Sequence, residues 1–386
     1  MTITKEDARK FILRKQGLIG KHRFQGKAGC LSFIEQVGCI QFDPIDRCGK
    51  NIDIVLFSRV SDYNKTMIDA LMYQDFKVVT QWDKNMSIYA VKDWPNLERT
   101  RQKMSNHYGA HLASFEALIQ PTLDILYQEA FVEAKDLNIN ASVTFYTWRH
   151  KKLSQAVLDY LFFKGDILVH HRKGIKRYFG LTSKYIDDHI LSKEQPFKTI
   201  EAYHRFMFKR RIGAVGMLGS GPSDAFLGIY GMKAMDRRKR FAELVELGEI
   251  IEIHVKDVGN YYLLKEDAGL LHVEQKDTKR VEFIAPLDSF IWDRKLISKI
   301  FDFDYKWEIY TPEKDRIYGP YVLPVLYGDS FVGRIDMRTD SKTNTLYVHH
   351  LWLERENLDQ TFHQLLKDRI HDFALFNGCK EVIYDD

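Results

Sequence analysis

The 386-residue sequence has no long hydrophobic run, and this absence argues against membrane-spanning helices. No apolar stretch approaches the roughly 18 residues that a transmembrane helix needs. The opening residues, MTITKEDARK, also lack the apolar core of a secretory signal. We therefore expect a cytoplasmic protein, and the 45% hydrophobic content is sufficient for several modest globular domains.

Cysteine is scarce, and metal-ligand patterns are missing. The four cysteines show neither CxxC pairing nor the density of a disulfide scaffold, so we expect buried, reduced thiols at Cys30, Cys39, Cys48 and Cys379. Two adjacent histidine pairs occur, His170-His171 and His349-His350. Neighbours on a strand point to opposite faces, so neither pair has the spacing of a metal site. The sequence predicts no metal and no organic cofactor.

Positive charge is modest in total, at +4, but it is unevenly distributed. Residues 1–30 and 141–180 each contain eight Lys and Arg against two Asp and Glu, and residues 201–240 contain nine against three. Residues 271–386 are acidic instead, with 16 against 21. One basic run alone is typical of a solvated surface. Three of them favour an anionic partner such as double-stranded DNA, which proteins bind first through its phosphates.

Two segments 83 residues apart are similar to each other without a gap. The first is AVLDYLFFKGDILVHHRKGIKRYFGL, ending at Leu181, and the second is KRFAELVELGEIIEIHVKDVGNYYLL, ending at Leu264. Each begins with apolar residues at helical spacing. Gly165 or Gly248 follows at the position of a left-handed helix cap, and two β-prone stretches then flank a polar turn. Helix, hairpin and basic tip form the pattern of a winged helix.

A looser third copy covers residues 65–91, where Asp75 replaces the glycine. Further helices are expected ahead of the three copies, at residues 5–16, 116–135 and 199–211. The predicted fold is therefore α+β, with three tandem winged helix-turn-helix units. Their predicted ranges are 1–112, 113–195 and 196–275. Residues 276–386 are predicted to form a β-rich region that closes with a capped helix ending at Gly378.

The segment Val37–Asp46 contains the most interesting polar residues. Asp43-Pro44 alone is typical of a helix start, since Asp caps unpaired N–H groups and Pro suits the first turn. On an extended segment, however, Gln41 and Asp43 project to the same face because they are two residues apart. An amide and a carboxylate held side by side can bind and polarise a water molecule. Both interpretations fit the sequence.

The run CIQFDPID at residues 39–46, together with LFSRV at residues 56–60, resembles the catalytic region of the AlkZ/YcaQ-like DNA glycosylases. That family has a Gln-x-Gln or Gln-hydrophobic-Asp signature, which is present here as Gln41-Phe42-Asp43. Residues 283–340 resemble the family's C-terminal block over nearly their whole length. The resemblance extends over essentially the entire chain. Around Trp82 the sequence departs from the acidic-aromatic-Trp run that the family often has, which affects the expected substrate range more than the fold.

The resemblance implies a concave basic surface made by the three winged units and hydrolysis of the N-glycosidic bond of alkylated bases, extending to interstrand crosslinks. Gln41 and Asp43 would be catalytic. A monomeric, monofunctional DNA glycosylase is the leading hypothesis, and a non-enzymatic winged-helix DNA-binding regulator is the alternative. The candidate phosphate contacts are Lys50, Arg59, Lys173, Lys176 and Arg177.

Overall fold

A computed structural model of the chain describes residues 1–137, 142–145, 149–273 and 278–385, which form a mixed α+β structure. The chain divides into two compact units, Met1–Lys65 with Glu201–Asp386 and Thr66–Ile200. The predicted repeat boundaries remain a prediction. Among the described residues, no helix is both long and apolar enough to cross a bilayer. All four cysteines are buried and lie outside any disulfide in the described chain, as expected.

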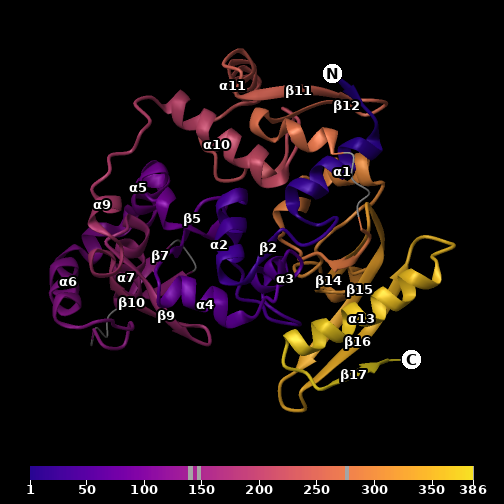
Figure 1. Cartoon of the computed structure of the whole chain (residues 1–386). Coiled ribbons are helices and arrows are strands. Elements are labelled where there is room, and N and C mark those ends of the chain that lie inside the picture. The colour runs from indigo at the N-terminus through magenta and orange to yellow at the C-terminus, as the bar shows by residue number, and fades with distance from the viewer. Residues whose placement is uncertain (138–141, 146–148, 274–277, 386) are drawn as a thin grey trace. The chain divides into compact units, whose positions relative to one another are not determined.

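The first unit contains both ends of the chain (Figure 1). Its helices are α1 (Lys5–Gln16), α2 (Gly26–Val37), α3 (Asn51–Phe57), α10 (Ile200–Val215), α11 (Ala234–Glu246), α12 (Arg294–Phe301) and α13 (Gln360–Phe376). Its strands are β1 (Thr2–Ile3), β2 (Phe24–Gln25), β3 (Ile40–Gln41), β4 (Val60–Ser61), β11 (Ile250–Val255), β12 (Gly259–Leu264), β13 (Val281–Phe283), β14 (Val322–Tyr327), β15 (Ser330–Asp340), β16 (Thr345–Leu353) and β17 (Glu381–Tyr384).

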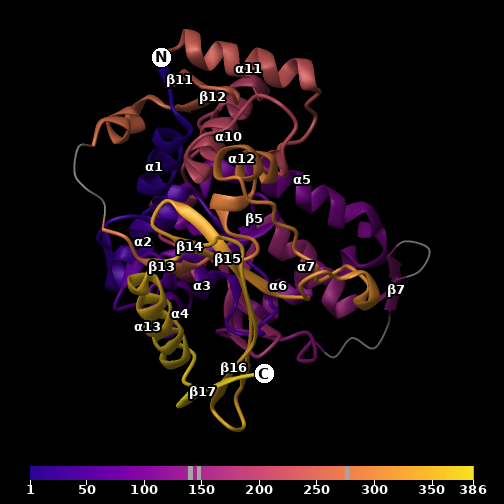
Figure 2. The same ribbon diagram turned by 90° about the vertical axis from the view of Figure 1, so that its right-hand side faces the viewer.

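The C-terminal region is a five-stranded sheet covered by one helix. The strand order is β13-β14-β15-β16-β17, antiparallel except for the parallel β16–β17 pair. Helix α13 lies along this sheet in Figures 1 and 2, and Phe373 packs edge-on against Phe283 with ring centroids 5.4 Å apart. The Asp359 side chain caps the first turn of α13, and the helix ends two residues before Gly378. The predicted β-rich region with a terminal capped helix is confirmed.

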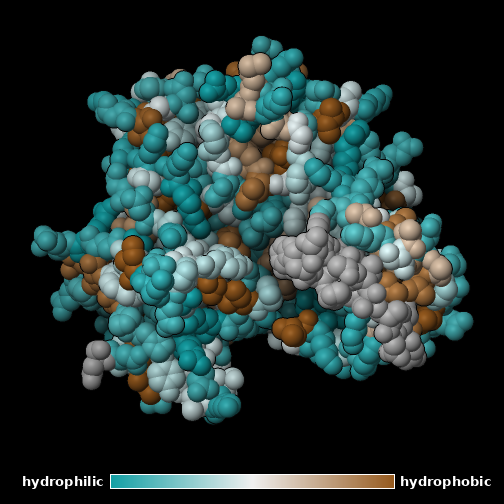
Figure 3. Space-filling model, turned by 180° about the vertical axis from the view of Figure 1, so that it is seen from behind, coloured by the Kyte–Doolittle hydropathy of each residue, from teal (hydrophilic) through white to brown (hydrophobic). Residues whose placement is uncertain are grey.

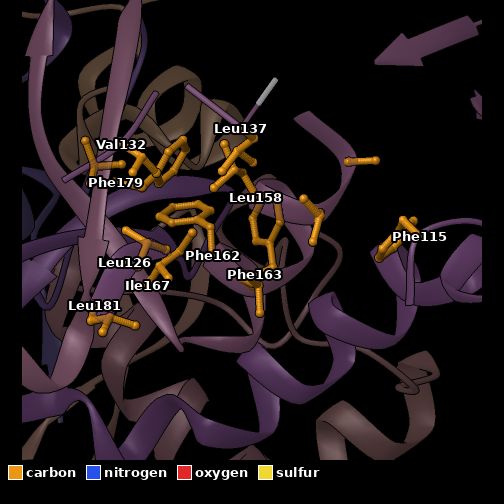
Figure 4. Packing of buried hydrophobic residues seen from close by; sticks show 14 of the residues in the cluster. Phe115, Leu126, Val132, Leu137, Leu158, Phe162, Phe163, Ile167, Phe179 and Leu181 are labelled. Atoms are coloured by element: carbon orange, nitrogen blue, oxygen red, sulfur yellow. The ribbon is translucent and has the colours of Figure 1, made fainter. Parts of the chain in front are cut away.

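The second unit is built around α7 and the β9–β10 hairpin. Its elements are α4 (Lys65–Tyr73), β5 (Val78–Trp82), β6 (Met86–Ala90), α5 (Glu98–Tyr108), α6 (Ile119–Gln128), β7 (Ser142–Phe145), β8 (Arg149–Lys152), α7 (Leu153–Lys164), β9 (Ile167–Lys173), β10 (Lys176–Leu181), α8 (Thr182–Tyr185) and α9 (Asp188–Leu191). Figure 4 shows Phe162 of α7 directed toward Phe179 of β10, beside Val132 and Leu126. The apolar face of α7 therefore supports the hairpin.

The helix, glycine and hairpin of both repeat copies are present. Gly165 follows α7 with φ +99°, and Gly248 follows α11 with φ +67°, a backbone region that glycine enters without steric cost. Figure 2 shows α11 beside the β11–β12 hairpin. The looser copy is α4 with the β5–β6 hairpin, where Phe76 takes the positive φ in place of a glycine. Helices α1 and α10 occupy the positions predicted ahead of the looser copy and of the copy ending at Leu264, whereas α6 covers only Ile119–Gln128 of the predicted 116–135.

One part of the third hairpin escaped prediction. The N-terminal strand β1 pairs in parallel with β11, through Thr2 with His254 and Ile3 with Val255. The hairpin therefore becomes a three-stranded sheet that includes the first residues of the chain. A two-residue strand is too short to show a period in the sequence.

Candidate active site

The signature segment begins where α2 ends. Gly38 closes the helix with φ +79°, and its carbonyl accepts a hydrogen bond from Arg210 Nη2 at 2.7 Å. A Cβ on Gly38 would meet the Arg210 side chain at 3.0 Å. Glycine at position 38 therefore allows the positive φ of this turn and also leaves room for the Arg210 side chain of α10. Strand β3 follows at once and carries Gln41.

Asp43 lies just beyond the strand, in a tight turn rather than at a helix start. Its Oδ1 accepts the N–H of Ile45 at 2.8 Å, and the next helix, α3, begins only at Asn51. The helix-cap interpretation of Asp43-Pro44 is therefore wrong. The side chain bonds to the backbone two residues ahead, a turn that Asp makes readily.

The surroundings of Asp43 suit a proton acceptor. The side chain is half-buried, and this burial raises the pKa of the carboxyl, while the Ile45 N–H partly opposes the shift. Within the described part of the chain, its second oxygen accepts no hydrogen bond. One oxygen is thus held in place, and the other remains available to a ligand.

Gln41 is positioned through its backbone. The residue is 9% exposed, and its carbonyl accepts a hydrogen bond from Asn51 Nδ2 at 2.8 Å. Asn51 is itself buried, and its Oδ1 accepts the N–H of Leu287 at 3.0 Å. A single side-chain amide therefore connects β3 to a segment more than 200 residues further along the chain. No local pattern in the sequence pointed to Asn51.

The loop between Asp43 and α3 is fastened to the C-terminal sheet. Thr339 of β15 donates both its N–H and its hydroxyl to the carbonyl of Arg47, at 2.9 and 3.2 Å. Asn377, which caps α13, donates from Nδ2 to the carbonyl of Cys48 at 2.9 Å. The Arg47 side chain also forms an ion pair with Asp336, whose Oδ2 lies 3.5 Å from Arg47 Nη2. These positioning residues were missed because they lie roughly 290 to 330 positions away in the sequence.

Three of the five candidate phosphate contacts are exposed. Lys50 precedes α3 as its N-cap residue, and Lys173 and Lys176 flank the tip of the β9–β10 hairpin. Arg177 is less available because its Nη2 donates to Asp159 at 2.7 Å. The role of these four residues in DNA binding remains a prediction.

The prediction that Arg59 contacts phosphates is wrong. Its side chain is 0% exposed, and Nη2 donates to the equally buried Asp288 at 2.8 Å. The remaining guanidinium N–H groups bond to Gln16, Val55 and Ser58. A fully enclosed and paired guanidinium cannot reach a phosphate, so Arg59 is a structural residue rather than a DNA contact.

His170 and His171 also differ from expectation. Their Nδ1 atoms are 2.8 Å apart, so the two rings do not point to opposite faces. The β9–β10 register shifts between Tyr178 and Phe179, and this bulge disrupts the regular alternation. Among the described residues, no group of three or more His, Cys, Asp or Glu side chains could hold a metal ion.

A family model for DNA glycosylase AlkZ-like proteins matches residues 34–376, which include the signature, both repeat copies and nearly all of the C-terminal sheet. The chain belongs to the AlkZ-like DNA glycosylase family. The fold is similar to that of Streptomyces sahachiroi DNA glycosylase AlkZ, with a TM-score of 0.66 and 14% sequence identity over 100% of both chains. As a member of the AlkZ-like family, the chain is a hydrolase of DNA repair whose substrate is DNA.

Proposed function

We propose that this AlkZ-like protein is a monofunctional glycosylase for alkylated bases in double-stranded DNA, working as a cytoplasmic monomer without a cofactor. The observation that carries the proposal is the carboxylate of Asp43. One oxygen is fixed by Ile45, the other accepts no hydrogen bond in the described chain, and burial raises the pKa. Preorganised groups of this kind contribute strongly to catalysis because they need no rearrangement in the transition state.

Alkylation at N7 of guanine or N3 of adenine makes the base cationic and therefore a good leaving group. As the C1′–N bond breaks, its electron pair neutralises the base, and positive charge develops on the sugar. The Asp43 carboxylate stabilises this charge and accepts the proton of the water whose oxygen bonds to C1′. Gln41, two residues earlier at the end of β3, orients that water. Neither step requires a metal.

The three helix–hairpin segments are proposed to act as winged helices on the duplex. Helices α4, α7 and α11 would be the recognition helices, and the hairpins that follow them would be the wings. Lys50, Lys173 and Lys176 would neutralise phosphates, with Arg177 in support. We extend the substrate range to bulky N7-guanine adducts and interstrand crosslinks. Release of a bulky N7 adduct from an oligonucleotide tests this extension, and activity limited to methyl lesions contradicts it.

Asp43→Asn is the decisive variant. Excision of N7-methylguanine, followed as strand cleavage at abasic sites, should fall by about 10²–10³-fold, while Kd for the duplex stays unchanged. Asp46→Asn is the matched control, because it removes a nearby carboxylate but keeps the oxygen that accepts the Gly49 N–H. Equal activity of the wild type and Asp43→Asn would refute the role of Asp43. If the wild type released no base but bound DNA, the non-enzymatic alternative would be correct.

The pH dependence of excision gives a second test of Asp43. The reaction needs the carboxylate, so the rate should fall as pH falls through the pKa of Asp43, which burial raises above its ordinary value of 3.8. N7-methylguanine keeps its charge throughout, so the acid limb reports the enzyme. Single-turnover rates should show this limb in the wild type, and the residual rate of Asp43→Asn should lack it.

A further inference from the structure

The tip of the β9–β10 hairpin presents an apolar side chain between two lysines. Lys173 pairs with Lys176 across the end of the hairpin, so the loop consists only of Gly174 and Ile175. Gly174 has φ +60° with open space around it, and Ile175 is 87% exposed. A glycine with positive φ at the first loop position is typical of a tight, well-defined hairpin turn.

Isoleucine is an unusual choice at this position. Tight turns favour Gly, Asn, Asp and Ser, whereas a β-branched side chain gains nothing there unless it packs. Hydrophobic residues on the face in Figure 3 occur as small, separate patches, and exposure alone is therefore no argument for a function. The argument comes from the rigid turn and the flanking charges together, because a local rule broken without structural gain points to a functional position.

The other two repeat copies provide an internal comparison. At the 83-residue offset, Val258 takes the place of Ile175, but it is only partly exposed, and Gly259 takes the place of Lys176. In the β5–β6 hairpin, the tip residues Asp83 and Lys84 are buried. Among the three repeat hairpins, as far as the structure describes them, only β9–β10 combines a highly exposed apolar tip with two exposed lysines.

We propose that Ile175 is a wedge that enters the base stack of duplex DNA while Lys173 and Lys176 hold the flanking phosphates. Glu133, whose carboxylate is close enough to interact with both lysines, is already paired with Lys135. Lys173 Nζ lies 5.5 Å from the centroid of the Tyr178 ring, and within the described chain neither Lys173 nor Lys176 forms an ion pair, so both ammonium groups can bind phosphates. Apolar side chains inserted between base pairs unstack and kink the duplex, and flanking cations supply the phosphate contacts. The wedge deepens the proposed function, since unstacking makes the sugar of a damaged nucleotide more accessible.

The test uses binding to an undamaged, fluorescently labelled duplex at several salt concentrations. Ile175→Ser should raise Kd about tenfold at every salt concentration, as expected for losing one buried aliphatic side chain. The slope of log Kd against log salt should not change. Lys173→Ala should instead reduce that slope by about 0.9, because one fewer counterion is released. Ile317→Ser is the matched control, because it removes an isoleucine that is 78% exposed and lies outside the three repeat hairpins, and it should change neither quantity.

A 2-aminopurine base in the duplex reports unstacking directly. Its fluorescence should increase when the wild type binds and should stay low with saturating Ile175→Ser. Unchanged affinity together with an unchanged 2-aminopurine signal in Ile175→Ser would overturn the wedge. Because no step of this experiment measures excision, failure of the wedge leaves the test of Asp43 untouched.

A membrane surface would also accept an apolar tip between lysines, and a tryptophan reporter separates the two partners. The emission of Ile175→Trp should be quenched by duplex DNA and should be unaffected by vesicles of phosphatidylcholine and phosphatidylserine. A blue shift with these vesicles and no response to the duplex would assign the tip to a membrane and would also overturn the wedge.

Discussion

At the scale of single residues, Arg59 and Asp43 are both ionisable, but Arg59 is fully buried and Asp43 only half-buried, and their partners differ. Arg59 is enclosed, and its guanidinium is satisfied by Asp288 and by oxygens of neighbouring residues. Asp43 has one local hydrogen bond and a pKa raised by burial. A charge that is fully paired belongs to the structure, whereas a charge held with an available oxygen can act on a substrate.

Replacing Arg59 should destabilise the fold, because the buried Asp288 carboxylate would lose its cation. Arg59→Met leaves the Asp288 carboxylate buried without its cation, so the free energy of unfolding should fall by about 3–5 kcal/mol. Urea denaturation measures this loss. The double variant Arg59→Met/Asp288→Asn should recover part of it, because the remaining buried charge is removed. A loss below about 1 kcal/mol in the single variant would mean that the pair behaves like an exposed ion pair.

At the scale of elements, the helix–glycine–hairpin unit is repeated with different packing around the glycine. Gly165 and Gly248 both have positive φ. A Cβ on Gly165 would lie 2.9 Å from the Trp94 ring, whereas the nearest atom to a Cβ on Gly248 is the flexible Lys265 Nζ at 3.7 Å. Both glycines therefore need a positive φ, but Gly165 is also tightly packed, whereas Gly248 has open space around it.

Substituting alanine at Gly165 and at Gly248 should separate the cost of positive φ from the cost of steric contact with neighbouring side chains. Gly248→Ala should lower the free energy of unfolding by about 1–2 kcal/mol, the ordinary cost of positive φ with a Cβ. Gly165→Ala should cost at least about 1 kcal/mol more, because the Trp94 ring must move. Thermal or urea unfolding of both variants gives the comparison. Equal losses would show that the second unit accommodates the methyl group and that only the backbone effect matters.

At the scale of the whole molecule, the signature loop depends on residues from the far end of the sequence. Asn377, at the end of α13, holds the carbonyl of Cys48, and Thr339 of β15 holds that of Arg47. The family match to residues 34–376 reaches almost to this asparagine. The C-terminal sheet is therefore a support for the signature loop as well as a folded region of its own.

Asn377→Ala should lower kcat for excision about tenfold while Kd for the duplex stays the same, because small displacements of a catalytic group slow the chemical step more than binding. Gln364→Ala is a suitable control, since this residue lies exposed on the same helix and its side-chain amide donates only to Asp368 within the described part of the chain. Retention of the wild-type kcat in a folded Asn377→Ala protein would contradict the supporting role.

The sequence by itself determined the α+β character, the repeated helix–glycine–hairpin segments and the C-terminal sheet with its capped helix. Each of these depends on the spacing of apolar residues, glycine and capping residues within a few turns of the chain. The extended conformation at Gln41 could be inferred in the same way, and the long block at residues 283–340 pointed to the family.

Only the tertiary structure decided which charged and polar side chains are available. Arg59 and Lys173 are both cations in basic or signature segments, yet the fold encloses one and exposes the other. The β-bulge that brings the His170 and His171 rings together depends on strand pairing. The hydrogen bonds from Thr339 and Asn377 depend on the packing of the C-terminal sheet and helix against the signature loop. Burial and hydrogen bonding between residues hundreds of positions apart leave no periodic signal in a sequence, and this is why the site's supports became visible only in three dimensions.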